Sequence, residues 1–163
     1  MPIGSRAETR AYLLRLPRKA FARFGIVLGM LLLLAGTAGA ATLITASEAA
    51  LPADTTAGRG ISRGPRITIV SPPPTGGLVR SPVNLRLRFE SFGGAKINAE
   101  SVVITYKKIP PIDLTQRVTA FITSEGIAMP VAEVPPGTHR IQVEVKDSDG
   151  RAGWVDFTFS VGR

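Results

Sequence analysis

The clearest hydrophobic pattern in this chain lies near its C-terminus, in residues 133–161. Apolar side chains occupy every second position from Ile141 to Val145 and again from Val155 to Val161, with mostly polar side chains between them. Successive side chains of a β-strand point to opposite faces, so each stretch predicts a strand with one apolar and one polar face. The sequence between them, Asp147–Gly150 (DSDG), has the residue types of a tight turn. The two strands are therefore predicted to form an antiparallel hairpin.

The same alternation is complete in residues 83–90, where four apolar side chains alternate with Asn, Arg, Arg and Glu. Such a strand is expected to pack on one face only. Shorter β-rich runs predict further strands at residues 66–70, 102–106, 117–123 and 127–133, with a loop at 91–99. The first of these precedes three prolines, which cannot donate to a ladder, so an edge position is expected.

About seven short strands separated by Pro and Gly, with no convincing helix, predict an all-β fold. A β-sandwich with Greek-key connections is the main interpretation, and a small barrel is the alternative. The predicted core of the sandwich consists of Ile69, Val83, Leu85, Leu87, Phe89, Val102, Ile104, Tyr106, Val118, Ala120, Ile141, Val143, Val145, Val155, Phe157 and Phe159.

The composition of the chain excludes several kinds of site. The chain has 163 residues and no cysteine, which excludes disulfides, thiolate metal sites and a cysteine nucleophile. Its net charge of +8 is uneven, because residues 1–40 hold six of the 20 basic side chains and one of the 12 acidic ones. The remainder carries +3, which gives little reason to expect nucleic-acid binding.

The N-terminal basic residues precede an apolar run and then a series of small residues. No charged side chain occurs from Phe24 to Ser47, and Ala38-Gly39-Ala40 fits a signal peptidase site. This order is typical of a secretory signal peptide, so residues 1–40 are predicted to be removed by cleavage before Ala41. The alternative is an uncleaved anchor across the inner membrane through residues 24–46, with the domain outside. Either interpretation predicts a periplasmic or extracellular domain.

Residues 41–65 show no sustained period of 2 or 3.6 and contain several Gly, Thr and Ser. They are predicted to form a flexible linker. The sandwich domain is then expected to span residues 66–163.

Few side chains in this sequence predict chemistry. Asp147 and Asp149 could offer oxygens to calcium, but the EF-hand loop pattern is incomplete, and a turn in which Asp and Gly serve the backbone is favoured. His139 is the sole histidine and is interpreted as structural, hydrogen-bonded near a sheet end. No nucleophile elbow or phosphate-binding glycine loop occurs. We therefore expect no enzyme activity, no cofactor and no metal site.

Binding is the remaining hypothesis. Arg86, Arg88, Arg140 and Lys146 have outward parity on two predicted strands, and Trp154 has outward parity on a third. An exposed Trp beside arginines is a common anchor in interfaces. Trp154, Arg86, Arg88 and Arg140 are therefore the candidate partner-binding residues. The competing interpretation is that Trp154 covers a sheet edge or turns inward at a bulge near Gly153.

Five segments share one further feature, and they are Arg66–Pro72, Pro82–Leu85, Pro136–Val143, Val145–Arg151 and Phe157–Val161. Together they resemble the bacterial Ig-like or fibronectin-type-III-like β-sandwich modules of exported proteins. The resemblance covers about residues 65–163 and lacks the antibody-type cysteine pair. It implies an envelope location and a role in binding or spacing other parts, with an envelope protein or a glycan as partner. A membrane-anchored spacer and a weak calcium-binding module are the alternative functions.

Overall fold

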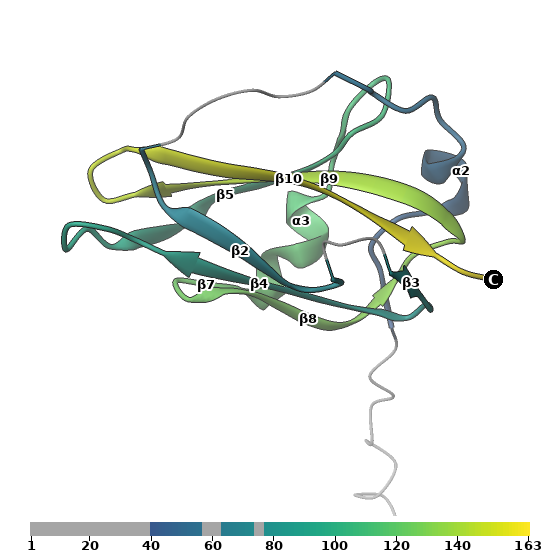
Figure 1. Cartoon of the computed structure of the whole chain (residues 1–163), viewed down its shortest axis with the longest axis horizontal. Helices are drawn as coiled ribbons and strands as arrows, with labels where there is room; N and C mark the ends of the chain where they lie inside the picture. The colour runs from purple at the N-terminus through teal and green to yellow at the C-terminus, as the bar shows by residue number, and fades with distance from the viewer. Residues whose placement is uncertain (1–39, 57–62, 74–76) are drawn as a thin grey trace, which may run out of the picture. The chain divides into compact units, whose positions relative to one another are not determined.

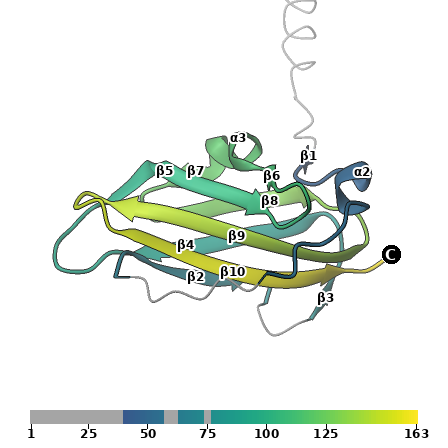
Figure 2. The same ribbon diagram turned by 90° about the horizontal axis from the view of Figure 1, so that it is seen from above.

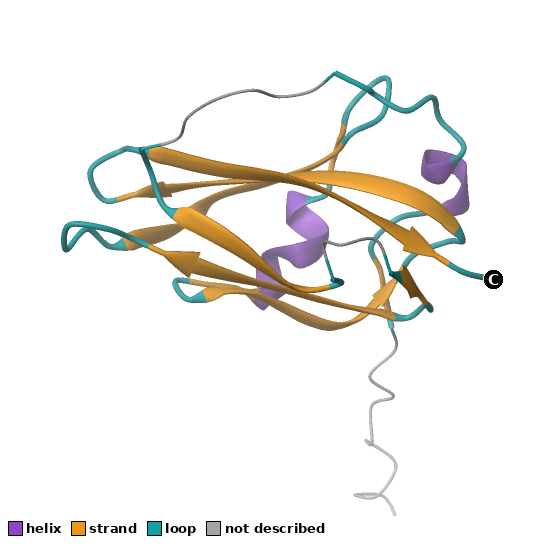
Figure 3. Ribbon diagram, viewed as in Figure 1, coloured by secondary structure: helices purple, strands orange, loops and turns teal. Residues whose placement is uncertain are grey.

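Two β-sheets face each other across a shared apolar core (Figure 1). The computed structural model describes residues 40–56, 63–73 and 77–163. Strands make up most of both layers (Figure 3), and the view from above shows β9 and β10 crossing over β4 (Figure 2). The predicted all-β sandwich is therefore confirmed.

The first sheet has the strand order β1-β8-β4-β2, and β7 also pairs with β8. The bounds of these strands are β1 (Ala41–Thr42), β2 (Arg66–Ser71), β4 (Val83–Glu90), β7 (Ile122–Thr123) and β8 (Gly126–Glu133). Strand β2 ends the strand order on its side, as its prolines predict. In β4 every apolar side chain is buried and every polar one is exposed, as expected from its period of two.

The second sheet has the strand order β3-β10-β9-β5-β6. Its strands are β3 (Leu78–Val79), β5 (Ile97–Tyr106), β6 (Ile112–Asp113), β9 (Gly137–Asp147) and β10 (Ala152–Val161). The predicted hairpin is formed by β9 and β10, which pair without a register shift from Ala152 opposite Lys146 to Val161 opposite Gly137. Strand β5 begins at Ile97, so part of the predicted loop at 91–99 belongs to a strand.

Two short strands each pair in parallel with a longer strand, whereas the sequence patterns predicted antiparallel pairs. β1 lies parallel to β8, and β3 lies parallel to the end of β10. Parallel neighbours need a long connection between them, so local sequence patterns give no sign of them.

The predicted strand at 117–123 is wrong. Residues Thr115–Val118 form helix α3, and Thr119–Phe121 continue as a 3-10 turn before β7. Leu114 and Val118, four residues apart, are both fully buried, which is the spacing of one helical face. Ala120, which the strand interpretation placed in the core, is exposed.

The predicted flexible linker at 41–65 also differs from the structure. Residues 41–56, called the N-terminal strap below, contain β1 and helix α2 (Ala46–Ala49) and pack onto the sandwich. Leu43 and Ile44 are only 1% and 2% exposed and belong to the core. Two adjacent apolar residues in a short segment carry no periodicity, so the pattern did not reveal their burial.

The predicted signal peptide or anchor lies outside the described residues apart from its last part. Residues 41–46, which the anchor interpretation included, belong to the strap. Within the described ranges, no helix is long and apolar enough to cross a membrane.

Candidate functional site

The four predicted contact residues lie on two opposite surfaces. Arg86 and Arg88 are exposed on β4, on the outer face of the first sheet. Arg140 and Trp154 have outward parity on β9 and β10, on the outer face of the second sheet. Strand parity predicted the correct face of each strand, but it could not show that the strands belong to different sheets.

Arg140 is already bound within the domain. Its Nε and Nη2 donate to the two carboxylate oxygens of Asp156 at 2.9 and 2.6 Å, and its Nη1 donates to the carbonyl of Asp54 at 3.1 Å. The hydrogen bond to Asp156 raises the pKa of Arg140 further. This guanidinium ties the hairpin to the strap.

Trp154 is half-buried on the outer face of the second sheet. It lies opposite Glu144, and Glu144 lies opposite Val103 on the next strand, so the three side chains form one row across the sheet. Val103 is 45% exposed, which leaves apolar surface in this row. A binding role for Trp154 stays a prediction.

Arg86 and Arg88 lie beside a hollow in the outer face of the first sheet. The hollow has a volume of about 360 Å³ and is lined by Val70, Arg86, Leu87, Arg88, Thr123, Glu125, Gly126, Ile127 and Ala128. It is called the β4–β8 trough below. In the described part of the chain neither arginine forms an ion pair.

The trough exists because β8 carries small residues opposite the arginines. Gly126 lies opposite Arg88 and Ala128 lies opposite Arg86. Gly126 has φ +150°, and a Cβ there would collide with the backbone of Leu87, so only glycine fits. Opposite the arginines, β8 therefore lines the trough with a glycine and with a side chain of one methyl group.

Glu125 closes one end of the trough. Its backbone carbonyl accepts from the N–H of Phe89 at 2.9 Å, and its backbone N–H donates to the hydroxyl of Thr123 at 3.2 Å. The turn is therefore fixed to β4, while the Glu125 residue is exposed. The trough is thus lined by two positive groups from β4 and by one negative group from the β7–β8 turn.

Seven of the nine trough residues were not predicted as site residues, and three of these, Val70, Thr123 and Glu125, lie outside both β4 and β8. They come from β2, β7 and the β7–β8 turn. Predicting these residues requires the knowledge that β8 pairs with β4, and alternation within one strand does not show which strand lies beside it.

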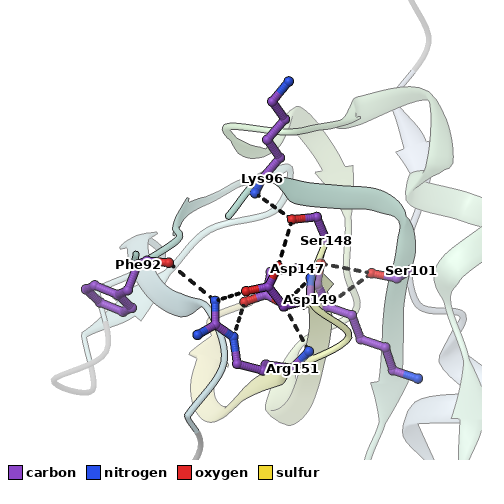
Figure 4. A network of polar contacts seen from close by, with 8 residues as sticks. Phe92, Lys96, Ser101, Asp147, Ser148, Asp149 and Arg151 are labelled. Carbon is purple, nitrogen blue, oxygen red and sulfur yellow. Dashed lines mark hydrogen bonds and ion pairs between the residues drawn. The ribbon is translucent and has the colours of Figure 1, made fainter. Parts of the chain in front are cut away.

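The DSDG turn of the hairpin is filled by an arginine (Figure 4). Asp147 Oδ1 accepts from the backbone N–H groups of Asp149 and Arg151, and Asp147 Oδ2 accepts from Arg151 Nε at 2.8 Å. Arg151 Nη2 also contacts Asp149 Oδ2 at 2.9 Å. Burial alone raises the pKa of Asp147, but the bonds from Arg151 hold it below its usual value.

The guanidinium of Arg151 binds the same carboxylate oxygens that a calcium ion would need as ligands. Both carboxylates of the turn are engaged by Arg151, and Gly150 takes the left-handed conformation with φ +76°. In the described ranges, no group of three or more His, Asp or Glu side chains is placed to hold a metal. The turn is therefore stabilising in the way that its Asp and Gly residues predict.

His139 is buried and hydrogen-bonded through both ring nitrogens. Tyr106 Oη lies 2.9 Å from Nδ1, and the carbonyl of Pro135 lies 2.8 Å from Nε2. The carbonyl can only accept, so Nε2 carries the proton and Nδ1 accepts from Tyr106. Burial lowers the pKa of His139 and raises the pKa of Tyr106 to about 12. The structural interpretation of His139 is confirmed.

Charged side chains also hold the N-terminal strap. Arg117 Nη1 and Nη2 donate to the two carboxylate oxygens of Glu48 at 2.8 and 2.7 Å. Lys108 Nζ donates to the carbonyls of Ala49 and Leu51, at the end of α2, at 2.7 and 2.8 Å. Lysine at the C-terminal carbonyls of a helix satisfies acceptors that have no helical partner.

Comparison with known proteins gives little further information. No protein-family model matches the chain, and no curated protein matches it. Among solved structures, the chain is similar to CopC from Methylosinus trichosporium OB3b, with 18% sequence identity and a TM-score of 0.38. The similarity covers 59% of this chain and 93% of that one. The β-sandwich assignment therefore rests on the strands and core described above.

Proposed function

We propose that this chain is an exported, non-catalytic binding module of the bacterial cell envelope, and that the β4–β8 trough is its contact surface. The observation that carries this proposal is the pair of exposed arginines, Arg86 and Arg88, without ion pairs in the described ranges. Arg117, Arg140 and Arg151, in contrast, each pair with a carboxylate of the domain.

The fold in this proposal is Ig-like. The strand order supports it, because β2, β4 and β8 share one sheet while β5, β9 and β10 share the other. A short strand that follows β2 in the chain, β3, moves to the opposite sheet and pairs in parallel with β10. Both features are those of an Ig-type sandwich whose first strand divides between the sheets.

Export in this proposal is supported by the N-terminal sequence, with its basic, apolar and small-residue regions in order. The domain is periplasmic or extracellular, and the partner is another envelope protein or a glycan. The alternative location is a single-pass inner-membrane protein with the domain outside. Nucleic acid is not proposed as a partner, because residues 41–163 carry only +3.

The non-catalytic part of the proposal is supported by His139. Its ring is buried with both nitrogens occupied, so it cannot exchange a proton with a substrate. A spacer function is less well supported, because the residues expected to serve as a tether, 41–56, are packed into the domain.

Site-specific photo-cross-linking tests the proposed function. A photoreactive amino acid replaces Ala128, inside the trough, in cells that make the full chain. The matched control carries it at Lys146, exposed on the outer face of the second sheet. We expect one discrete cross-linked species from position 128 and not from position 146, in the envelope fraction or the medium. Equal cross-linking at both positions, or at neither, would contradict the proposal.

A further inference from the structure

We propose that the β4–β8 trough binds an extended acidic peptide segment of a partner protein. Two carboxylates on alternate residues of this segment face Arg86 and Arg88, and a basic residue faces Glu125. This inference rests on the proposed function and names the ligand class of the same site. It follows from the spacing, the order and the surroundings of three charged side chains.

The spacing of the arginines matches an extended peptide. Arg86 and Arg88 are two residues apart on a regular strand, so their Cα atoms are about 6.8 Å apart. An extended ligand repeats its own side chains on one face with the same period, so carboxylates at alternate positions reach both guanidiniums together. Each guanidinium can donate two parallel hydrogen bonds to one carboxylate, a geometry that lysine cannot offer.

The order of charges adds specificity. In the β4–β8 pairing Arg86 lies opposite Ala128 and Arg88 lies opposite Gly126, and the carbonyl of Glu125 accepts from the N–H of Phe89, so Glu125 lies beyond Arg88. The trough therefore presents positive, positive and negative groups in sequence. The complementary segment has acidic, acidic and basic side chains at alternate positions. A ligand with a negative charge on every unit would place one against Glu125, which is unfavourable.

The floor and one side of the trough suit a peptide backbone. On the β8 side the trough is lined by Gly126 and Ala128, so no side chain larger than a methyl group stands at these two positions. On the other side, Val70 is 53% exposed, and its neighbour Ser71 pairs with Arg86. Apolar side chains between the acidic ones can pack against Val70. The contact is thus charged along one side and apolar on the other, as in the polar rim and apolar centre of protein interfaces.

Peptide titration tests this inference. The probe is a labelled peptide with the pattern Glu-Thr-Glu-Thr-Lys, and the control has the same composition in the order Glu-Thr-Lys-Thr-Glu. Binding to the exported full-length protein is measured by fluorescence anisotropy at low and physiological salt. We expect the probe to bind at least fivefold more tightly than the control, because the control places its lysine against Arg88 and a glutamate against Glu125.

Matched variants locate the binding. Arg86→Gln and Arg88→Gln are each expected to weaken binding of the probe by about tenfold, the value of one charge-assisted hydrogen bond. Arg80→Gln removes the same charge from an exposed position outside the trough and is expected to leave binding unchanged. Glu125→Gln is expected to weaken binding of the probe and to strengthen binding of an all-acidic peptide. All four residues are exposed, so thermal denaturation should show intact folding.

The outcomes separate this inference from the proposed function. Equal binding of probe and control, or equal weakening by Arg80→Gln, would show non-specific charge attraction and overturn the peptide assignment. A uronic-acid oligosaccharide that binds more tightly than the probe, with the same dependence on Arg86 and Arg88, would overturn it in favour of a glycan. If cross-linking at position 128 succeeds while the probe does not bind, the ligand class is wrong and the binding module stands.

Discussion

The β9–β10 hairpin and the N-terminal strap are both integral to the domain, but they are held in different ways. The hairpin strands follow each other in the chain and pair residue by residue, from Ala152 opposite Lys146 onward. The strap has only two residues in a strand and one turn of helix, and its partners come much later in the sequence. Regular alternation of apolar side chains stabilises the hairpin, and a few specific long-range contacts stabilise the strap.

The contacts of the strap combine apolar burial with charge. Leu43 and Ile44 fill the core, while Arg117 donates to the carbonyl of Leu43 at 2.8 Å and to Glu48. At its other end, Lys107 contacts Asp54 at 2.7 Å. A segment without periodicity can therefore have a defined position in the native fold through a few buried side chains and specific polar contacts.

The largest expected effect tests whether the strap is as integral as the hairpin. Leu43→Ala should lower the free energy of unfolding by about 3 kcal/mol, because it removes a buried side chain and leaves a cavity. Ile141→Ala, in the hairpin core, should have an effect of the same size. Urea denaturation measures both. Thr55→Ala, exposed in the strap, is the control, and a cost for Leu43→Ala as small as that of Thr55→Ala would show that the strap is a linker.

The next effect tests the charged part of the strap. Glu48→Gln should lower the free energy of unfolding by about 1.5 kcal/mol at neutral pH, since Glu48 accepts two bonds from Arg117. The hydrogen bonds from Arg117 lower the pKa of Glu48 from 4.5 to about 2. This stabilisation is complete above the ordinary pKa and is lost as the pH falls from about 4.5 towards 2.

The difference between wild type and Glu48→Gln should therefore shrink across that acid range. Thermal denaturation at several pH values measures it. Glu100→Gln, at an exposed position on β5, is the control and should follow the wild type. A difference that is constant from neutral pH to pH about 2 would mean that the Arg117 pair does not stabilise the strap.

An effect of the same size concerns the outer face of the hairpin. Trp154→Ala should lower the free energy of unfolding by about 1.5 kcal/mol, because the side chain is only half-buried. Phe159→Ala, on the inner face of the same strand, should cost about 4 kcal/mol. Chemical denaturation of the two variants compares the faces directly. A cost for Trp154→Ala as large as that for Phe159→Ala would identify Trp154 as a packing residue and contradict its role as a binding anchor.

The smallest effect concerns the turn of the hairpin. Millimolar calcium should leave the melting temperature unchanged, because Arg151 already engages Asp147 and Asp149. Arg151→Gln should lower the melting temperature, since Asp147 then loses its charged partner in a nearly buried position. Scanning calorimetry with calcium and with a chelator measures both. A rise in melting temperature with calcium in the wild type would restore the calcium hypothesis.

Alternation explains why much of the sandwich was predictable from the sequence. Residues 83–90 and the hairpin strands bury one face each, so their apolar side chains must recur with period two. Leu114, Val118, Phe121 and Ile122 have helical spacing, but the β-branched residues among them suggested a strand. The strap has too few apolar residues for either period, and its position depends on partners that only the folded chain brings near.

The candidate site was predictable in part for the same reason. Parity placed Arg86 and Arg88 on an exposed face, which is correct. It could not supply the neighbouring strand, and the hollow depends on Gly126 and Ala128 of that strand. Parity also could not show that the guanidinium of Arg140 is hydrogen-bonded to Asp156.

The distances along the chain between the strap and its partners set an order of folding. Thr42 bonds to Glu133, 91 residues later, and Glu48 bonds to Arg117, 69 residues later. Closing such long loops is entropically costly and slow, so the hairpin can form before the strap docks. The strap is then expected to be the last segment to join the domain and the first to leave it. Hydrogen exchange should find the backbone N–H of Leu43 less protected than those of β9, although both are hydrogen-bonded in the native state.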